Sequence, residues 1–123
     1  LLQNEVLAKN YQEGYCLVYR LCVNHYHRYC YIDDGYHSSP TFIKGRLHTV
    51  RPIALENVAV FSENSREYTL LETDHFGNII QIEIGALCVG KIHTNETLKH
   101  SLLEILELNP HLVIKMKHYK NFV

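Results

Sequence analysis

The chain has 123 residues, which is the size of a single domain. Its 12 Lys and Arg residues against 13 Asp and Glu residues give a net charge of −1, which argues against a nucleic-acid partner. No apolar run approaches the ~20 residues that a membrane-spanning helix needs, and no secretion signal opens the chain.

The N-terminal residues carry a helical pattern that then changes to the period of a strand. Leu2, Val6 and Leu7 lie among polar residues, which predicts a short helix that ends by Gly14. Over residues 15–23 the apolar residues alternate with polar or smaller ones. Since alternate side chains of a strand share one face, this segment is predicted to be a strand.

The next segment is rich in tyrosine, histidine and arginine. We expect residues 25–31 to form a strand that is closed by a turn at residues 33–35, where two aspartates precede a glycine. Residues 37–40 have the composition of a loop. Residues 41–50 are predicted to form a further strand that stops near Pro52.

The middle of the chain contains the strongest strand signal. Residues 54–61 are apolar but too short to distinguish a helical turn from a strand. Residues 66–73 and 78–84 flank a four-residue turn, which predicts a β-hairpin. The regular strand spacing predicts a mainly β (α+β) fold, a small antiparallel β-sandwich or barrel with one or two short helices, as one domain over residues 1–123.

The tail, residues 93–123, has a different pattern. Leu98, Leu102 and Ile105 recur at helical spacing. We therefore predict a helix over residues 96–108, ended by the Asn-Pro pair that follows.

The four cysteines show neither a CxxC pair nor the spacing of metal ligands. Cys16, Cys22 and Cys88 lie in apolar runs, where we expect a thiol to act as a small buried hydrophobe. Cys30 is most simply a buried apolar filler. We expect no disulfide framework and a reducing, cytoplasmic environment.

Four segments resemble, in the right order, the phosphatidylserine decarboxylase family. Residues 25–30 resemble the family's Asp-Tyr-His-Arg-x-His, and residues 45–52 its Gly-x-Leu-x-x-Val-x-Pro. Residues 61–66 match Phe-x-x-Asn-x-Arg, and residues 85–92 match Gly-Ala-x-x-Val-Gly-x-Ile. The resemblance is clearest over residues 14–92, whereas the tail has diverged.

The resemblance implies the conversion of phosphatidylserine to phosphatidylethanolamine and CO₂ at a membrane surface. Family enzymes use a pyruvoyl cofactor that they make from a serine of their own chain, and its carbonyl takes up electrons as CO₂ leaves. The implied partners are phosphatidylserine or the membrane surface, and a homologous or catalytic subunit. The implied location is cytoplasmic and peripheral at the membrane. Because the first residue is Leu1, we expect a fragment that lacks the family's preceding membrane-contacting helices and Asp-Gly motif.

The resemblance also implies a role for each residue that matches a family position. His27 is the retained histidine for substrate binding or proton donation, and Tyr26 and Arg28 beside it are substrate-binding candidates. Cys30 stands where the family has the self-cleavage histidine, and His111 stands where it has the pyruvoyl-forming serine.

These departures bear on whether the cofactor can form. The chain contains no Gly-Ser pair, and an imidazole cannot undergo the acyl shift and elimination that make a pyruvoyl group. A thiol with a pKa of about 8.5 is a poor replacement for an imidazole base. We therefore expect no pyruvoyl cofactor in this chain.

Simpler explanations exist for the same residues. His25 and His27 would share a strand face and could bind a metal, but no further ligands stand at the usual spacing, so we predict no metal site. His27 and Arg28 could instead cap a sheet edge, and His111 could be a surface turn residue.

Three hypotheses for the whole chain remain open. It is part of a decarboxylase whose other sections hold the remaining catalytic groups. Alternatively, it is a non-catalytic relative that binds an aminophospholipid headgroup or a catalytic partner subunit. In the third hypothesis it is a small β domain with an unrelated role.

Overall fold

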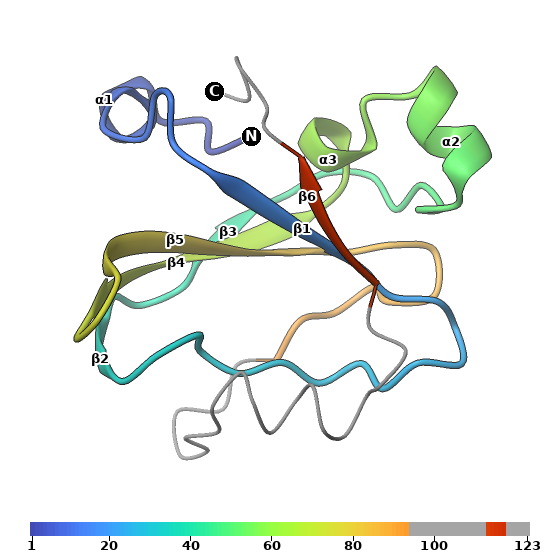
Figure 1. Ribbon diagram of the computed structural model, residues 1–123. Coiled ribbons are helices and arrows are strands. Elements are labelled where there is room, and N and C mark those ends of the chain that lie inside the picture. Colours follow the sequence, from blue (N-terminus) through green and yellow to red (C-terminus); the bar gives the residue numbers. More distant parts are fainter. Residues whose placement is uncertain (94–112, 118–123) are drawn as a thin grey trace.

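The computed structural model of the protein describes residues 1–93 and 113–117 (Figure 1). Its elements are, in chain order, α1 (Glu5–Lys9), β1 (Cys16–Arg20), β2 (Gly35–His37), β3 (Thr41–Ile43), α2 (Pro52–Asn57), α3 (Val60–Glu63), β4 (Arg66–Thr73), β5 (Gly77–Ile84) and β6 (Val113–Lys117). Strands prevail over the three short helices of the described residues. The predicted mainly β, antiparallel α+β fold is confirmed.

β4 is the central strand of the larger sheet. β5 pairs with it antiparallel along its whole length, which confirms the predicted hairpin. On the other edge of β4, β3 pairs with its first three residues and β2 with its last three. Ser38 bridges the space between β2 and β3, since its N–H donates to the Leu70 carbonyl at 2.9 Å and its Oγ accepts from the Leu70 N–H at 3.1 Å.

A second, two-stranded sheet joins the beginning of the chain to its end. β1 pairs antiparallel with β6, from Cys16 opposite Lys117 to Arg20 opposite Val113. The strand predicted over residues 15–23 is therefore confirmed, but it is limited to residues 16–20. The predicted helix over residues 96–108 lies outside the described residues.

The strand predicted over residues 25–31 is wrong, because this segment forms neither strand nor helix. β1 ends at Arg20, where its pairing with β6 also ends. A turn then redirects the chain, closed by a 2.9 Å hydrogen bond from the His25 N–H to the Cys22 carbonyl. Alternating residues form a strand only where a neighbouring strand accepts their hydrogen bonds.

Two further expectations need correction. The strand predicted over residues 41–50 is limited to β3, since the chain then leaves the sheet and Arg46 forms a parallel bridge with Asn64. Pro52 does not merely stop a strand but begins α2, because its fixed φ suits the first turn of a helix. Residues 54–61, left open between helix and strand, contribute to α2 and α3. In Figure 1 these two helices lie away from the turn of the β4–β5 hairpin.

The side chain of Asn64 joins three separate segments of the chain. It is 0% exposed. Its Oδ1 accepts from the His48 N–H at 2.9 Å, and its Nδ2 donates to the carbonyls of His48 at 2.9 Å and Gly85 at 2.7 Å. The amide thus uses its oxygen and both of its N–H groups. We call this set of contacts the Asn64 junction.

Close backbone contacts reinforce the Asn64 junction. The Gly45 N–H donates to Ser65 Oγ, and Ser65 Oγ donates to the Gly45 carbonyl, both at 2.9 Å. A Cβ at Gly45 would collide with the carbonyl of Glu63. Only glycine therefore permits this approach of the two segments.

Arg66 connects the junction to the N-terminus. Its side chain is almost completely buried, at 1% exposure, and its guanidinium donates to the carbonyls of Ser62 at 2.8 Å, Asn64 at 2.9 Å and Leu1 at 2.6 Å. Burial lowers the pKa of this guanidinium. The three carbonyl dipoles replace the water that a buried charge loses.

We predict that Asn64→Ala lowers the free energy of unfolding by about 3 kcal/mol, because it leaves one buried N–H and two carbonyls without their partner. Urea unfolding followed by circular dichroism measures this. Asn57→Ala is the matched control, since Asn57 is exposed and its side chain makes one bond, at 2.7 Å to the Ile53 carbonyl. We expect ~0.5 kcal/mol or less for the control. Equal losses in the two variants would contradict the role of the junction.

Candidate functional site

Four of the five predicted site residues lie in one loop between β1 and β2. We call residues 21–34 the histidine loop. Tyr26, His27 and Arg28 are exposed on it, and Cys30 is half-buried. His111 lies outside the described residues.

The two histidines of the histidine loop are held in opposite tautomers. The Nδ1 of His27 lies 2.7 Å from the carbonyl oxygen of His25, and because a carbonyl can only accept, this nitrogen carries a proton. The Nδ1 of His25 accepts the backbone N–H of Cys22 at 3.3 Å and is therefore without a proton in this contact. For His27 this leaves Nε2 as the ring nitrogen that can accept a hydrogen bond.

Tyr26 and Arg28 contact each other. The guanidinium carbon of Arg28 lies 5.8 Å from the centroid of the Tyr26 ring. At an exposed site such a cation–π contact is worth about 0.5–1 kcal/mol. Both side chains remain open to solvent, so the guanidinium can still bind an anion such as a phosphate or carboxylate.

The cysteine predictions need partial correction. All four cysteines are described, and none forms a disulfide. Cys16 lies in β1 but is half-buried rather than buried, and this burial raises the pKa of its thiol. Cys22 is half-buried in the histidine loop, and Cys88 is exposed in a turn, so neither is the buried strand residue that we predicted. Cys30, predicted to be buried, is half-buried. Apolar neighbours in sequence do not ensure burial where no strand forms.

A polar contact fastens the end of the histidine loop to the turn of the β4–β5 hairpin. Asp33 accepts the His75 backbone N–H at 2.9 Å, and its carboxylate lies 3.1 Å from Nδ1 of the same histidine. Next to it, the Asp74 N–H donates to the Asp34 carbonyl at 3.0 Å. The hydrogen bond to Asp33, followed by its charge, raises the pKa of His75. The loop that carries His27 therefore has one fixed end.

The described residues show neither a metal cluster nor a membrane span. No group of three or more His, Cys, Asp or Glu side chains among them is placed to hold a metal ion. In the same residues, no helix has the length and apolar character to cross a bilayer.

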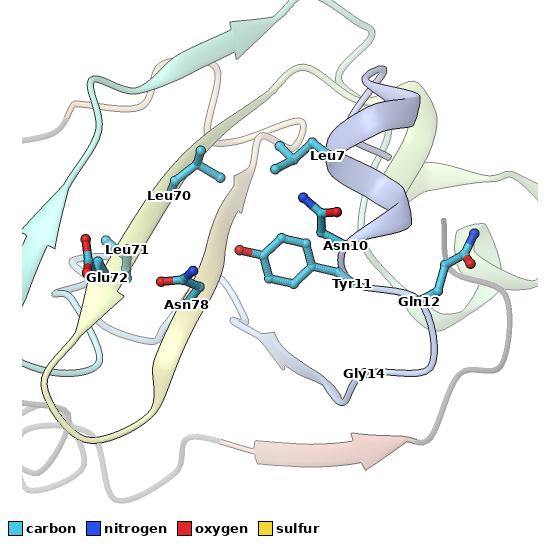
Figure 2. Close-up of a pocket in the computed structure, with 9 residues that line it drawn as sticks. All are labelled: Leu7, Asn10, Tyr11, Gln12, Gly14, Leu70, Leu71, Glu72 and Asn78. Carbon is cyan, nitrogen blue, oxygen red and sulfur yellow. The ribbon is translucent and has the colours of Figure 1, made fainter.

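A cavity of about 410 Å³ lies away from the histidine loop, between α1 and the β4–β5 hairpin (Figure 2). None of the predicted site residues lines it. The last residues of the histidine loop, Tyr31, Asp33 and Asp34, instead border a second, much smaller hollow beside β2 and β4.

Three of the four motif segments converge at the Asn64 junction. Residues 45–52 contribute Gly45 and His48, residues 61–66 contribute Asn64, and the segment from residue 85 contributes the carbonyl of Gly85. A family model described as phosphatidylserine decarboxylase matches residues 1–120. The chain belongs to the phosphatidylserine decarboxylase family. The resemblance carried by the four motifs is thus confirmed.

Individual relatives support the same family. Phosphatidylserine decarboxylase proenzyme 2 of Clostridium acetobutylicum is 55% identical over 92 residues, which are 75% of this chain and 32% of that protein. A phosphatidylserine decarboxylase proenzyme of Clostridium botulinum (strain Hall) is 46% identical over 93 residues, again 75% and 32% of the two chains. The match thus spans about a third of the length of these relatives. No solved structure matches the chain.

Sequence reasoning missed the contacts that position the site. Asp33 and His75 are 42 residues apart, and no pattern links them before the fold is known. Asn64 was found as part of a motif, but its burial and its three hydrogen bonds were not foreseen. The one sequence signal for this role is the presence of a polar asparagine inside a family motif.

We predict that His75 titrates above its ordinary pKa of about 6.5. Because its pKa is raised in the folded state, His75 stabilises the fold fully below the unfolded value, and this contribution is lost as the pH rises through the folded value. Proton NMR of the ring measures the titration. Asp33→Asn should lower the pKa of His75 clearly, and the control Asp74→Asn should lower it less. An equal decrease in both variants would contradict the contact with Asp33.

We also predict the tautomers of the histidine loop. At a pH where both rings are neutral, His27 should carry its proton on Nδ1, because this nitrogen donates to the His25 carbonyl. His25 should carry its proton on Nε2, because its Nδ1 accepts the Cys22 N–H. Long-range ¹H–¹⁵N correlation spectra distinguish the two forms, and each histidine serves as the control for the other. Observation of the same tautomer in both rings would refute the bond from His27 to the His25 carbonyl.

Proposed function

We propose that this chain is a phosphatidylserine decarboxylase-type domain that presents the family's histidine loop but forms no pyruvoyl group of its own. The observation that carries the proposal is the bond from Nδ1 of the exposed His27 to the His25 carbonyl, which leaves Nε2 available to a ligand. In the family, this histidine is the one implied in substrate binding or proton donation.

The proposed ligand is the headgroup of phosphatidylserine at a membrane surface. Arg28 offers a guanidinium, which pairs well with phosphate or carboxylate oxygens. Nε2 of His27 can donate a hydrogen bond to the same anionic group when the ring is protonated, or hold a proton beside it. Tyr26 keeps Arg28 in place through the ring contact at 5.8 Å. The chain would bind the membrane peripherally, on its cytoplasmic side.

The residues present do not fit a self-generated pyruvoyl group. No serine of the sequence follows a glycine, and the family position of the nucleophile is His111. Three serine hydroxyls donate to backbone carbonyls: Ser38 to Ser39 at 3.1 Å, Ser62 to Ala59 at 3.1 Å and Ser65 to Gly45 at 2.9 Å. These hydroxyls serve the scaffold, and none of them is bonded to a base that could activate it.

Two roles follow from this, and different observations favour them. Because the match covers only 32% of the relatives, the chain can be one part of a decarboxylase whose remaining groups come from other sections or from a catalytic subunit. Because Cys30 and His111 replace the two groups that self-cleavage requires, the chain can instead be a non-catalytic relative that binds an aminophospholipid headgroup or a catalytic partner. In both roles the histidine loop is the binding element.

We predict that the purified 123-residue chain stays one polypeptide and releases no CO₂ from phosphatidylserine vesicles. No hydroxyl stands at position 111 for the acyl shift, and no imidazole stands at position 30 to activate one. Intact-mass measurement together with a carbonyl-reactive probe tests this directly.

Two fragments, of which the smaller carries a ketone at its N-terminus, would contradict this prediction. Ser101 would then be the first candidate nucleophile, although His100 rather than glycine precedes it. The variant Ser101→Ala is the control for that outcome, since it should abolish any cleavage at this position and leave cleavage elsewhere unchanged.

A further inference from the structure

Glu83, near the end of β5, is an acidic residue that the sheet half-buries. Its Oε1 accepts a hydrogen bond from Nε2 of Gln81 at 2.8 Å. Its Oε2 is shielded from water and has no hydrogen-bond partner among the described residues. Since this oxygen has lost its hydration without a replacement, the charged form of the carboxyl group is disfavoured.

A second carboxyl group lies directly opposite Glu83. Glu67 of β4 is its partner in the antiparallel ladder, and the Cβ atoms of directly opposite residues are about 4.5–5.5 Å apart. On its other side Glu67 adjoins Phe42 of β3, which carries no charge. Arg66 does not neutralise the pair, because neighbouring residues of a strand point to opposite faces and its guanidinium is bonded to backbone carbonyls. Two carboxylates placed side by side repel each other, which favours a proton on one of them.

The other titratable groups described on this face of the sheet lie farther away. His37 of β2 is opposite Leu71, four residues along β4 from Glu67, which is about 13 Å in a strand. Asp33 and Asp34 of the histidine loop border the small hollow beside Leu71, at the same far end of β4. The charge of Glu67 is therefore the nearest that these described groups place beside Glu83.

These surroundings change the proton affinity of Glu83. Burial, which has the largest effect, and the charge of Glu67 raise the pKa of its carboxyl group. Together they outweigh the hydrogen bond from Gln81, which lowers this pKa. The folded chain therefore holds the proton at a pH where the unfolded chain has released it.

Glu83 is two residues from the Asn64 junction. The Gly85 carbonyl accepts from Nδ2 of Asn64 at 2.7 Å, and the Gly85 N–H donates to the Ser65 carbonyl at 2.8 Å. A carboxylate formed at Glu83 gains free energy by moving toward water, and a displacement of the end of β5 acts on these two bonds. We propose that Glu83 and Glu67 form a pH-dependent switch in the scaffold. A proton on Glu83 keeps the end of β5 at the Asn64 junction, and loss of this proton loosens it.

The direction of the pH dependence follows from the folded and unfolded states. Because the pKa of Glu83 is raised in the folded chain, its contribution to stability is fully present below the ordinary glutamate value of about 4.3. The contribution falls as the pH rises and is lost once the pH has passed through the folded value. The proposal concerns the scaffold and does not require the decarboxylase role.

Carbon-detected NMR of the glutamate carboxyl groups tests the first part of the proposal. We expect Glu83 to titrate at a higher pH in the folded chain than in the same chain unfolded in urea. Glu67→Gln should lower the midpoint of Glu83 toward the unfolded value, because it removes the opposing charge and keeps the length of the side chain. Equal midpoints in the folded and unfolded chains, or a midpoint that Glu67→Gln leaves unchanged, would overturn the proposal.

Amide hydrogen exchange tests whether this proton acts on the Asn64 junction. The protection factor of the Gly85 amide should fall several-fold as the pH rises through the midpoint of Glu83. The Ser38 amide, which donates to the Leu70 carbonyl on the far edge of β4, should keep its protection factor over the same range and serves as the internal control.

Glu83→Gln separates the switch from other effects of pH, because its side chain has nearly the same shape and is neutral at every pH. This variant should keep the low-pH protection of Gly85 throughout, and Glu67→Gln should move the decrease to lower pH. The control Glu56→Gln, on the exposed surface of α2, should show the decrease of the unmodified chain. Circular dichroism checks that each variant is folded. Protection of Gly85 that is independent of pH in the unmodified chain, or a decrease that persists in Glu83→Gln, overturns the switch.

Discussion

The buried amide of Asn64 is the interaction on which the described fold depends. It ties the segment before α2, the end of α3 and the segment after β5 to a single side chain. β4 begins two residues later, at Arg66, whose own buried guanidinium is solvated by nearby carbonyls. Because β4 is the strand with which β2, β3 and β5 all pair, its starting point sets the position of the whole larger sheet. Displacing any one segment would leave buried polar groups without partners.

The sequence predicts structure well where the information is local. The β4–β5 hairpin follows from two strand-like segments on either side of a short turn, with alternating isoleucines in the second, and the structure contains it with nearly the predicted bounds. The strand predicted over residues 25–31 has equally suitable residues, but the pairing of β1 with β6 ends at Arg20, before this segment begins. Whether a segment forms a strand depends on whether the fold places another strand beside it, and the segment's own residues do not determine this. The prediction that Pro52 only stops a strand was incomplete for a related reason. Proline suits both the end of a strand and the first turn of a helix.

For the candidate site, family motifs locate residues but do not separate structural from chemical roles. The Asn and Arg of one motif hold the fold together, whereas His27, from another motif, stands on an exposed loop. The two groups can diverge independently. The contacts around Asn64 involve no residue of the histidine loop. The cavity beside α1 had no sequence signal at all, because residues far apart in the chain build it.

The pairing of β1 with β6 also has a kinetic consequence. The two strands come from nearly opposite ends of the chain, so their pairing closes the longest loop of the described fold and carries a large entropic cost. The β4–β5 hairpin is local and can form early, whereas β1 must wait until residues 113–117 have been synthesised. Until then its backbone N–H and C=O groups form an open strand edge, which other chains can join. Pairing with residues 113–117 thus both completes the small sheet and removes a site for aggregation.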